Sequence, residues 1–121
     1  MTLRDQIKNV IDDEPVAIFI KGTPERPACG NSMRALQALR NAGAPITAVD
    51  ILPDPQIRQE LTALSDWPTI PQVFVKGELL GGADITEELF ASGELARKLD
   101  DALGEEREQV VKTVSVAATR A

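Results

Sequence analysis

The chain has 121 residues, of which 43% are hydrophobic and 26% charged, and its formal net charge is −6. This length suits one domain with a single core, and no hydrophobic run approaches the roughly 18 residues that a membrane-spanning helix needs. We therefore expect one soluble domain with no membrane span and no nucleic-acid partner, because affinity for a phosphate backbone comes from clustered Lys and Arg.

Two residue types are scarce or absent, and this limits the catalytic groups and metal ligands that the protein can use. The chain has no histidine and a single cysteine, Cys29. Without histidine there is no Cys-His pair, no Ser-His-Asp triad and no imidazole ligand for zinc or haem. One cysteine forms no intrachain disulfide, and the charged N-terminal residues are unlike a secretory signal. We therefore expect a cytoplasmic protein whose chemistry depends on sulfur or oxygen.

The first half of the chain alternates between helical and strand patterns. Residues 3–11 carry hydrophobic side chains at helical spacing, with Thr2 as the N-cap candidate. Residues 16–20 form a continuous hydrophobic run, which is typical of a strand buried on both faces. A second helix is predicted to begin near Asn31 and to end before Gly43. Its pattern consists of Met33, Leu36, Leu39 and Arg40.

The next elements complete a β-helix-β unit and continue with a hairpin. Residues 46–51 form a second predicted strand, which should pair in parallel with the first because the crossover is a helix. A third helix is predicted over residues 53–64, with Ile57, Leu61 and Leu64 facing inward. Lys76-Gly77 is a two-residue turn between two short hydrophobic runs, so the third and fourth strands are expected to be antiparallel.

Two helices and a tail are predicted after the hairpin. Asp84 is the expected N-cap of the first of these helices, and its inward residues are expected to be Leu89 and Phe90. The last helix is expected to run through Leu95 and Leu99. Residues 105–121 lack a closing signal and are interpreted as a weakly held tail, which leaves residues 1–104 as the domain.

Cys29 lies where a loop meets the second predicted helix. Pro24 and Pro27 mark that loop, and Lys21 and Arg26 add positive charge to it. Unpaired backbone N–H groups at a helix N-terminus favour the thiolate over the thiol. A buried structural cysteine is the alternative on residue type alone, but the loop on either side of Cys29 favours a reactive thiol.

The order of the predicted elements is typical of an α/β protein with a thioredoxin-like fold, in which helices flank a four-stranded mixed sheet. Four motifs in this order resemble the monothiol glutaredoxin family, and the resemblance covers about residues 3–104. The motifs are Lys21-Gly22-Thr23-Pro24, Cys29-Gly30-Asn31-Ser32, Trp67-Pro68-Thr69-Ile70-Pro71-Gln72 and Gly81-Gly82-Ala83-Asp84-Ile85.

The resemblance implies a glutathione site. In the family, the residues that match Lys21 and Arg58 contact glutathione carboxylates, and Ile70-Pro71 matches a cis-proline turn that pairs with the cysteinyl part. The backbone N–H of Ala83 and the carboxylate of Asp84 match the groups that receive the γ-glutamyl end. From the sequence alone, Lys21 is equally consistent with a solvated charge and Asp84 with a helix N-cap only, whereas Arg58 is more typical of a plain surface residue.

The resemblance also implies how one thiol works. Ser32 replaces the second cysteine of a dithiol enzyme, so exchange at Cys29 must use a thiol from solution, such as glutathione. A 2Fe-2S cluster usually needs four ligands, and in the family two subunits each supply the matching cysteine and a glutathione. This chain departs from the family at Asn31, where Phe is expected, and at Ala83, where many relatives carry another cysteine.

Three functions remain open from the sequence. The leading one is an iron-sulfur carrier, which binds a 2Fe-2S cluster as a glutathione-ligated homodimer and transfers it to apo iron-sulfur proteins; relatives also form heterodimers with BolA-type proteins. The second is an enzyme, a glutathione-dependent monothiol oxidoreductase in which Cys29 attacks glutathionylated proteins. The third is an interaction adaptor in which Cys29 is incidental. The sequence does not decide whether the protein is an enzyme.

Overall fold

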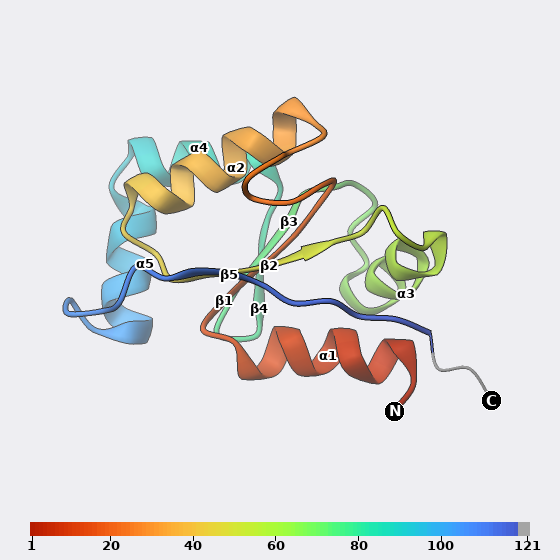
Figure 1. Ribbon diagram of the computed structural model, residues 1–121. Coiled ribbons are helices and arrows are strands. Elements are labelled where there is room, and N and C mark those ends of the chain that lie inside the picture. Colours follow the sequence, from red (N-terminus) through yellow and green to blue (C-terminus); the bar gives the residue numbers. More distant parts are fainter. Residues whose placement is uncertain (119–121) are drawn as a thin grey trace.

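In the computed structural model, which describes residues 1–118, five helices cover the two faces of a five-stranded sheet (Figure 1). The helices are α1 (Leu3–Asp13), α2 (Gly30–Asn41), α3 (Pro55–Ser65), α4 (Ala83–Ala91) and α5 (Glu94–Leu103). The strands are β1 (Val16–Ile20), β2 (Ile46–Asp50), β3 (Gln72–Val75), β4 (Glu78–Gly81) and β5 (Val111–Thr113), in the sheet order β4-β3-β1-β2-β5. None of the described helices could span a membrane.

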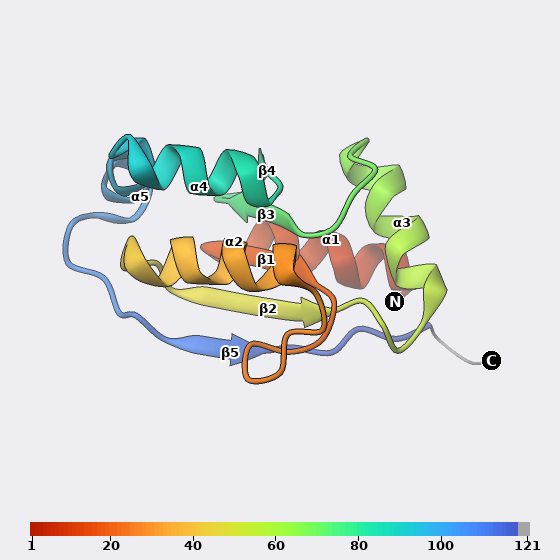
Figure 2. The same cartoon turned by 90° about the horizontal axis from the view of Figure 1, so that it is seen from above.

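The central strand β1 divides the core into two halves. All five of its residues are buried, as expected for a strand with helices on both faces. Ile18 and Ile20 pack with α2, α4 and α5 on one face, and Phe19 packs with α1 and α3 on the other (Figure 2). The thioredoxin-like α/β fold expected from the sequence is confirmed.

The local signals in the sequence lead to the expected structures. Thr2 and Asp5 form a reciprocal capping box at the start of α1. Strands β1 and β2 pair in parallel, and β3 pairs with β1 and β4 in antiparallel fashion. Lys76 and Gly77 have positive φ angles of 50° and 83°, which suit a two-residue hairpin turn between β3 and β4.

The sheet has five strands where four were expected. Strand β5 pairs in parallel with β2, in the register Ile46 to Val111, and it comes from the segment interpreted as a weakly held tail. A strand of three residues is too short to show a periodic pattern, and its partner strand lies about 65 positions away. A local pattern in the sequence therefore does not reveal the pairing. Residues 119–121 of the expected tail lie outside the described residues, and the domain boundary at residue 104 stays a prediction.

Arg107 connects the C-terminal segment to the body of the protein. Its side chain is 11% exposed and forms an ion pair of 2.6 Å with Asp100 of α5. It also donates to the carbonyl oxygens of Ala42, Gly43 and Gly104, at 3.0, 3.1 and 2.8 Å. A nearly buried guanidinium with this many acceptors fixes the path of the chain between α5 and β5.

The segment after β5 is held by α1. Gln6 donates to the carbonyl oxygen of Ala117 at 2.7 Å and accepts from its N–H at 3.1 Å. Val116 is 8% exposed and joins the core cluster that contains Ile7 and Phe74. The C-terminal segment is therefore held against the domain at Arg107, along β5, and at Val116 and Ala117.

Two residues expected to face inward, Phe90 and Leu64, are exposed instead. Phe90 is 39% exposed and Leu64 36%, and Met33 of the second predicted helix is 56% exposed, whereas Leu95 and Leu99 are buried. The buried face of α2 contains Ser32, Leu36 and Leu39, a spacing of four and three residues that leaves Met33 off the face. In each helix the apolar stripe is narrower than the hydrophobic pattern predicted.

Candidate functional site

Cys29 is the N-cap residue of α2, which begins at Gly30, one position before the start that the sequence predicted near Asn31. Its backbone is extended, its carbonyl accepts the N–H of Met33 at 3.1 Å, and its side chain makes no capping hydrogen bond. The thiol is partly exposed at the junction of the loop and the helix. This confirms the position that the sequence predicted for Cys29, next to the unpaired N–H groups of the first turn.

The electrostatic surroundings of Cys29 favour the thiolate. The backbone N–H of Ser32 lowers the pKa of the Cys29 thiol, against the opposing effect of partial burial, and the Asn31 N–H, the Ser32 hydroxyl and the charge of Lys21 add to the decrease. The Ser32 side chain is fully buried and accepts the N–H of Lys21 at 3.2 Å. The residue that replaces a second cysteine therefore stabilises the first as an anion.

The loop before Cys29 is held by its own backbone. The N–H of Ala28 donates to the carbonyl of Lys21 at 2.8 Å, and the N–H of Gly22 donates to Asp50 at 2.9 Å. Gly22 has a φ of 91°, and a Cβ at this position would lie 2.4 Å from the carbonyl oxygen of Arg26. Only glycine fits there, so this residue fixes the distance between Lys21 and Cys29.

Lys21 and Arg58 line one open groove of about 780 Å³ beside β2 and α3. Arg58 donates to the carbonyl oxygen of Pro68 at 3.2 Å, which directs the guanidinium along the groove wall. Two cations on one concave surface can bind a carboxylate. The structure brings both residues to one groove, and their role in binding glutathione stays a prediction.

The loop before β3 has the backbone that the resemblance implied. The peptide bond between Ile70 and Pro71 is cis, and both residues are buried. Gly82 lies against this turn, because a Cβ there would be 3.4 Å from the carbonyl oxygen of Pro71 and 3.6 Å from Nε1 of Trp67. The turn and the start of α4 are therefore in direct contact.

Asp84 is not the N-cap of α4, contrary to the prediction. Gly82 caps the helix, and Asp84 lies in its first turn with a side chain that is 83% exposed. The carbonyl of Gly82 accepts the Thr86 hydroxyl at 2.7 Å. Ala83 is 7% exposed and packs into the core. The glycine shifts the helix start by two residues because its backbone fits against the proline turn.

Arg34 was not predicted from the sequence, and it lies at the centre of the polar contacts between α2 and α4. Arg34 donates to Asp84 at 2.6 Å, to Glu87 through Nε at 2.8 Å and through Nη2, and to the side chain of Asn31 at 2.8 Å. The spacing of Asn31 and Arg34 predicts a contact on one helix. The carboxylates come from 50 or more residues away, so no local signal could reveal the full network.

The predicted residues fall into separate groups. Lys21 and Arg58 line the groove, whereas Asp84 lies outside it on α4 and is joined to α2 through Arg34. Within the described residues, no three side chains of the metal-binding types gather at one place. A metal bound at Cys29 therefore needs ligands from outside this chain.

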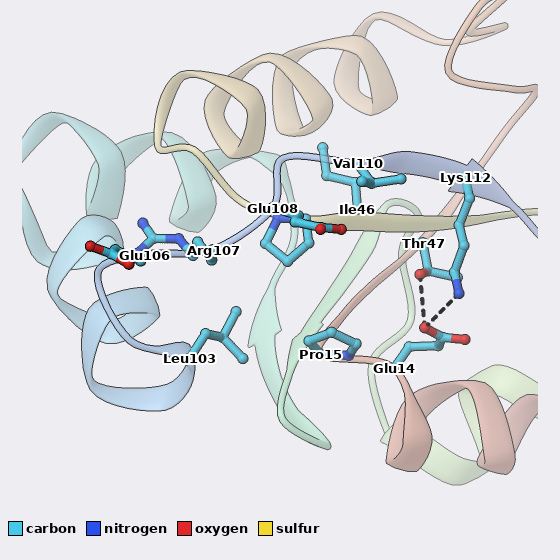
Figure 3. Close-up of a pocket in the computed structure, with 11 residues that line it drawn as sticks. Glu14, Pro15, Ile46, Thr47, Leu103, Glu106, Arg107, Glu108, Val110 and Lys112 are labelled. Atoms are coloured by element: carbon cyan, nitrogen blue, oxygen red, sulfur yellow. Dashed lines mark hydrogen bonds and ion pairs between the residues drawn. The ribbon is translucent and has the colours of Figure 1, made fainter.

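A second cavity, of about 480 Å³, lies where the C-terminal segment crosses the sheet (Figure 3). Its polar side chains pair with one another: Glu14 accepts the Thr47 hydroxyl at 3.1 Å and lies 3.2 Å from Nζ of Lys112. No residue predicted from the sequence to act in the site lines this cavity. Its contacts hold β5 against α1 and β2.

The fold and the site define a thioredoxin-like protein with one activated thiol at a helix N-terminus. The family model for glutaredoxin matches residues 16–80. Glutaredoxin 4 of Pasteurella multocida is 48% identical over 101 residues, which cover 84% of this chain and 93% of that protein. The probable monothiol glutaredoxin GrlA of Legionella pneumophila is 52% identical over 86 residues, 71% of this chain and 97% of that protein.

The solved structures agree with these relatives. The solution structure of reduced poplar apo GrxS14 superposes with a TM-score of 0.74 at 40% identity, and the alignment covers 84% of this chain and 93% of that one. The chain belongs to the monothiol glutaredoxin family, which confirms the resemblance found in the sequence.

Proposed function

We propose that this protein carries a 2Fe-2S cluster and transfers it to apo iron-sulfur proteins. In this proposal the cluster is cargo, bound between two protomers by Cys29 and one glutathione from each. The observation that carries the proposal is the single thiol, with a lowered pKa, at the N-terminus of α2 in a chain with no other cysteine. Four thiolates for one cluster then require two chains and two external thiols.

The surroundings of Cys29 support glutathione as the external thiol. Glutaredoxins bind glutathione, and the groove beside Cys29 has the cations Lys21 and Arg58. In the proposed complex these two residues bind the glycyl carboxylate, and the turn at Ile70-Pro71 pairs with the cysteinyl part. The backbone N–H of Ala83 and the side chain of Asp84 receive the γ-glutamyl end.

The replacement of Phe by Asn at position 31 is compatible with this proposal. The Asn31 side chain accepts a hydrogen bond from Arg34, so its amide oxygen has a partner on the surface of α2. The backbone N–H of Asn31 contributes to the lowered pKa of Cys29, and any residue at this position supplies it. Thiolate formation therefore does not depend on an aromatic side chain at position 31.

The partners in this proposal are proteins and glutathione. A second copy of the chain completes the cluster, and the recipients are apo iron-sulfur proteins, with a BolA-type protein as an alternative partner in a heterodimer. We place this exchange in the cytoplasm. The formal net charge of −6 suits selective protein docking better than nucleic-acid binding.

Anaerobic reconstitution tests the carrier function directly. The purified protein is incubated with iron, sulfide and glutathione, and visible absorption, circular dichroism and size-exclusion mass are recorded together. We expect a glutathione-dependent chromophore on a dimer, absent in Cys29→Ser. A colourless monomer, under conditions in which Asn31→Phe assembles a coloured dimer, would show that this chain has lost cluster binding.

A monothiol oxidoreductase is the second candidate function, because the same lowered pKa makes Cys29 a nucleophile. The Cys29 thiolate would attack the glutathione sulfur of a glutathionylated protein, break that disulfide and release the protein thiolate, which takes up a proton. The thiolate of a second glutathione would then attack the glutathione sulfur of the Cys29–glutathione disulfide. This step forms oxidised glutathione and releases the Cys29 thiolate for another cycle. Efficient turnover of this cycle without a chromophore on reconstitution would favour the enzyme.

A further inference from the structure

Asp84 is held from one side by Arg34. The exposed carboxylate uses Oδ1 to accept from Nη2 of Arg34 at 2.6 Å, and this contact spans from α2 to α4. Within residues 1–118, Oδ2 of Asp84 has no hydrogen-bond partner, so this oxygen is available to a ligand. An aspartate that is 83% exposed would otherwise sample several side-chain rotamers.

Arg34 is itself held on two further sides. Glu87 accepts from Nε at 2.8 Å and also from Nη2, and Asn31 accepts from Nη1 at 2.8 Å. The planar guanidinium therefore has one acceptor in each of its three directions. This arrangement explains why a short amide at position 31 suits this chain, since a phenyl ring offers no acceptor.

We propose that Arg34 is a positioning residue for the γ-glutamyl end of glutathione, which orients Asp84 so that its second oxygen meets the ligand's α-amino group. The inference rests on the proposed glutathione site. Glutathione is the ligand in question because its γ-glutamyl end has an ammonium beside a carboxylate. A carboxylate that is already oriented binds an ammonium without the entropic cost of ordering its side chain.

Arg34 orients Asp84, but its positive charge also repels the incoming ammonium. The gain from orientation must therefore be compared with the cost of repulsion. The guanidinium contacts one oxygen of Asp84 and shares the same nitrogen with Glu87. The three groups together keep a charge of −1, which still attracts a cation. Because the contact is exposed, water and salt screen the repulsion, whereas the ordering of the carboxylate is not screened. Orientation therefore outweighs repulsion, and loss of Arg34 weakens binding.

The test measures glutathione affinity by NMR titration of the Ala83 and Asp84 amides, in the reduced 121-residue chain. We expect Arg34→Gln to bind glutathione about three- to tenfold more weakly than the wild type, as loss of one ordered side chain implies. In the Asp84→Asn background, Arg34→Gln should change the affinity less than twofold. Arg34→Lys should restore part of the loss, since one ammonium reaches Asp84 but not all three partners.

A second ligand separates positioning from a general effect on the helix. Glutaryl-cysteinylglycine keeps the γ-glutamyl carboxylate and lacks the α-amino group. Arg34→Gln should leave its affinity unchanged, so that the preference for glutathione falls by the same three- to tenfold. Arg97→Gln removes an exposed arginine paired with Glu94 on α5 and is the matched control, with wild-type affinity expected.

Each outcome of these titrations either supports the inference or overturns it. Weaker binding of glutathione alone, removed by Asp84→Asn, supports the inference. Equal or tighter binding by Arg34→Gln, equal loss for both ligands, or an undiminished loss in the Asp84→Asn background each overturns it while leaving the glutathione site intact. A wild-type protein that binds neither ligand overturns the proposed function, and the role of Arg34 with it.

Discussion

Two segments of this protein differ in the contacts that hold them in place. One is the loop before Cys29, and the other is the C-terminal segment of residues 105–118. The loop is fixed mainly by hydrogen bonds among its own residues and by Gly22, whose neighbours leave no room for a Cβ and whose N–H donates to Asp50 of β2. The C-terminal segment is fixed by partners far away in the chain, at Ala42, Ala48 and Gln6. Local contacts position the chemistry, and distant contacts complete the fold.

The difference predicts that each segment can be disturbed without the other. Replacing Cys29 by Ser has the largest expected effect, because the chain has no other thiol. Alkylation by iodoacetamide and assembly of a chromophore should both be lost completely. The fold should persist, since the Cys29 side chain makes no capping bond and serine is a good N-cap. Hydrogen exchange at Ile46 and Val114 provides the control and should match the wild type.

Arg107→Ala should disturb the other segment. The variant removes a nearly buried guanidinium and leaves the carbonyls of Ala42 and Gly43 without their donor. We expect a loss of about 1–3 kcal/mol in the free energy of unfolding, by denaturant titration. Amide exchange should accelerate at Ile46 and Val114, which pair with Val110 and Ala48. An accompanying rise in the pKa of Cys29 would show that the two segments are coupled after all.

Val116→Ala should have a smaller effect of the same kind. The substitution removes two methyl groups from a side chain that is 8% exposed beside Ile7 and Phe74. At about 0.8 kcal/mol for each buried carbon, stability should fall by about 1–2 kcal/mol. Val110→Ala is the matched control, because Val110 is 51% exposed and should lose little. Equal losses for the two variants would mean that the segment after β5 is not packed in solution.

Ser32→Ala sharpens the comparison at the thiol. The hydroxyl is one of the groups that lower the pKa of Cys29, so its removal should raise that pKa, while the backbone N–H of residue 32 keeps part of the effect. The pH profile of alkylation should move to higher pH, and Ser92→Ala, at the far end of α4, should not move it. An unchanged profile in Ser32→Ala would assign the whole decrease to the helix N-terminus.

The lowered pKa of Cys29 also makes the free energy of unfolding depend on pH in a defined direction. The pKa of the Cys29 thiol is lower in the folded chain than in the unfolded one, so the unfolded chain binds more protons between the two values. Stability should therefore rise with pH across that interval and be lost as pH falls through the folded value. Cys29→Ser should abolish this slope, as measured by unfolding at several pH values.

The features that the sequence could predict are those that depend on local contacts, and the features that it missed depend on distant contacts. The N-cap at Thr2, the turn at Lys76-Gly77 and the place of Cys29 were predicted because each depends on neighbours within a few residues. Strand β5 and the partners of Arg34 were missed because they depend on residues 50 to 65 positions away.

The error at Asp84 has a different cause. An acidic residue near a helix start is a strong N-cap signal, yet the contact between Gly82 and the proline turn sets where α4 begins. The exposure of Met33 and Phe90 has a related origin, since their neighbours occupy the narrow buried stripes of α2 and α4. Tertiary packing decided these positions over local preference.

Trp67 provides the protein with its own optical reporter. It is the chain's one tryptophan, and the chain has no tyrosine, so ultraviolet emission comes from a single indole. Its Nε1 is buried with no hydrogen-bond partner among the described residues, and it lies beside Gly82 at the junction of the proline turn and α4. Any molecule that supplies an acceptor or quencher there would change the emission wavelength or lifetime of unlabelled protein, in real time and at micromolar concentration.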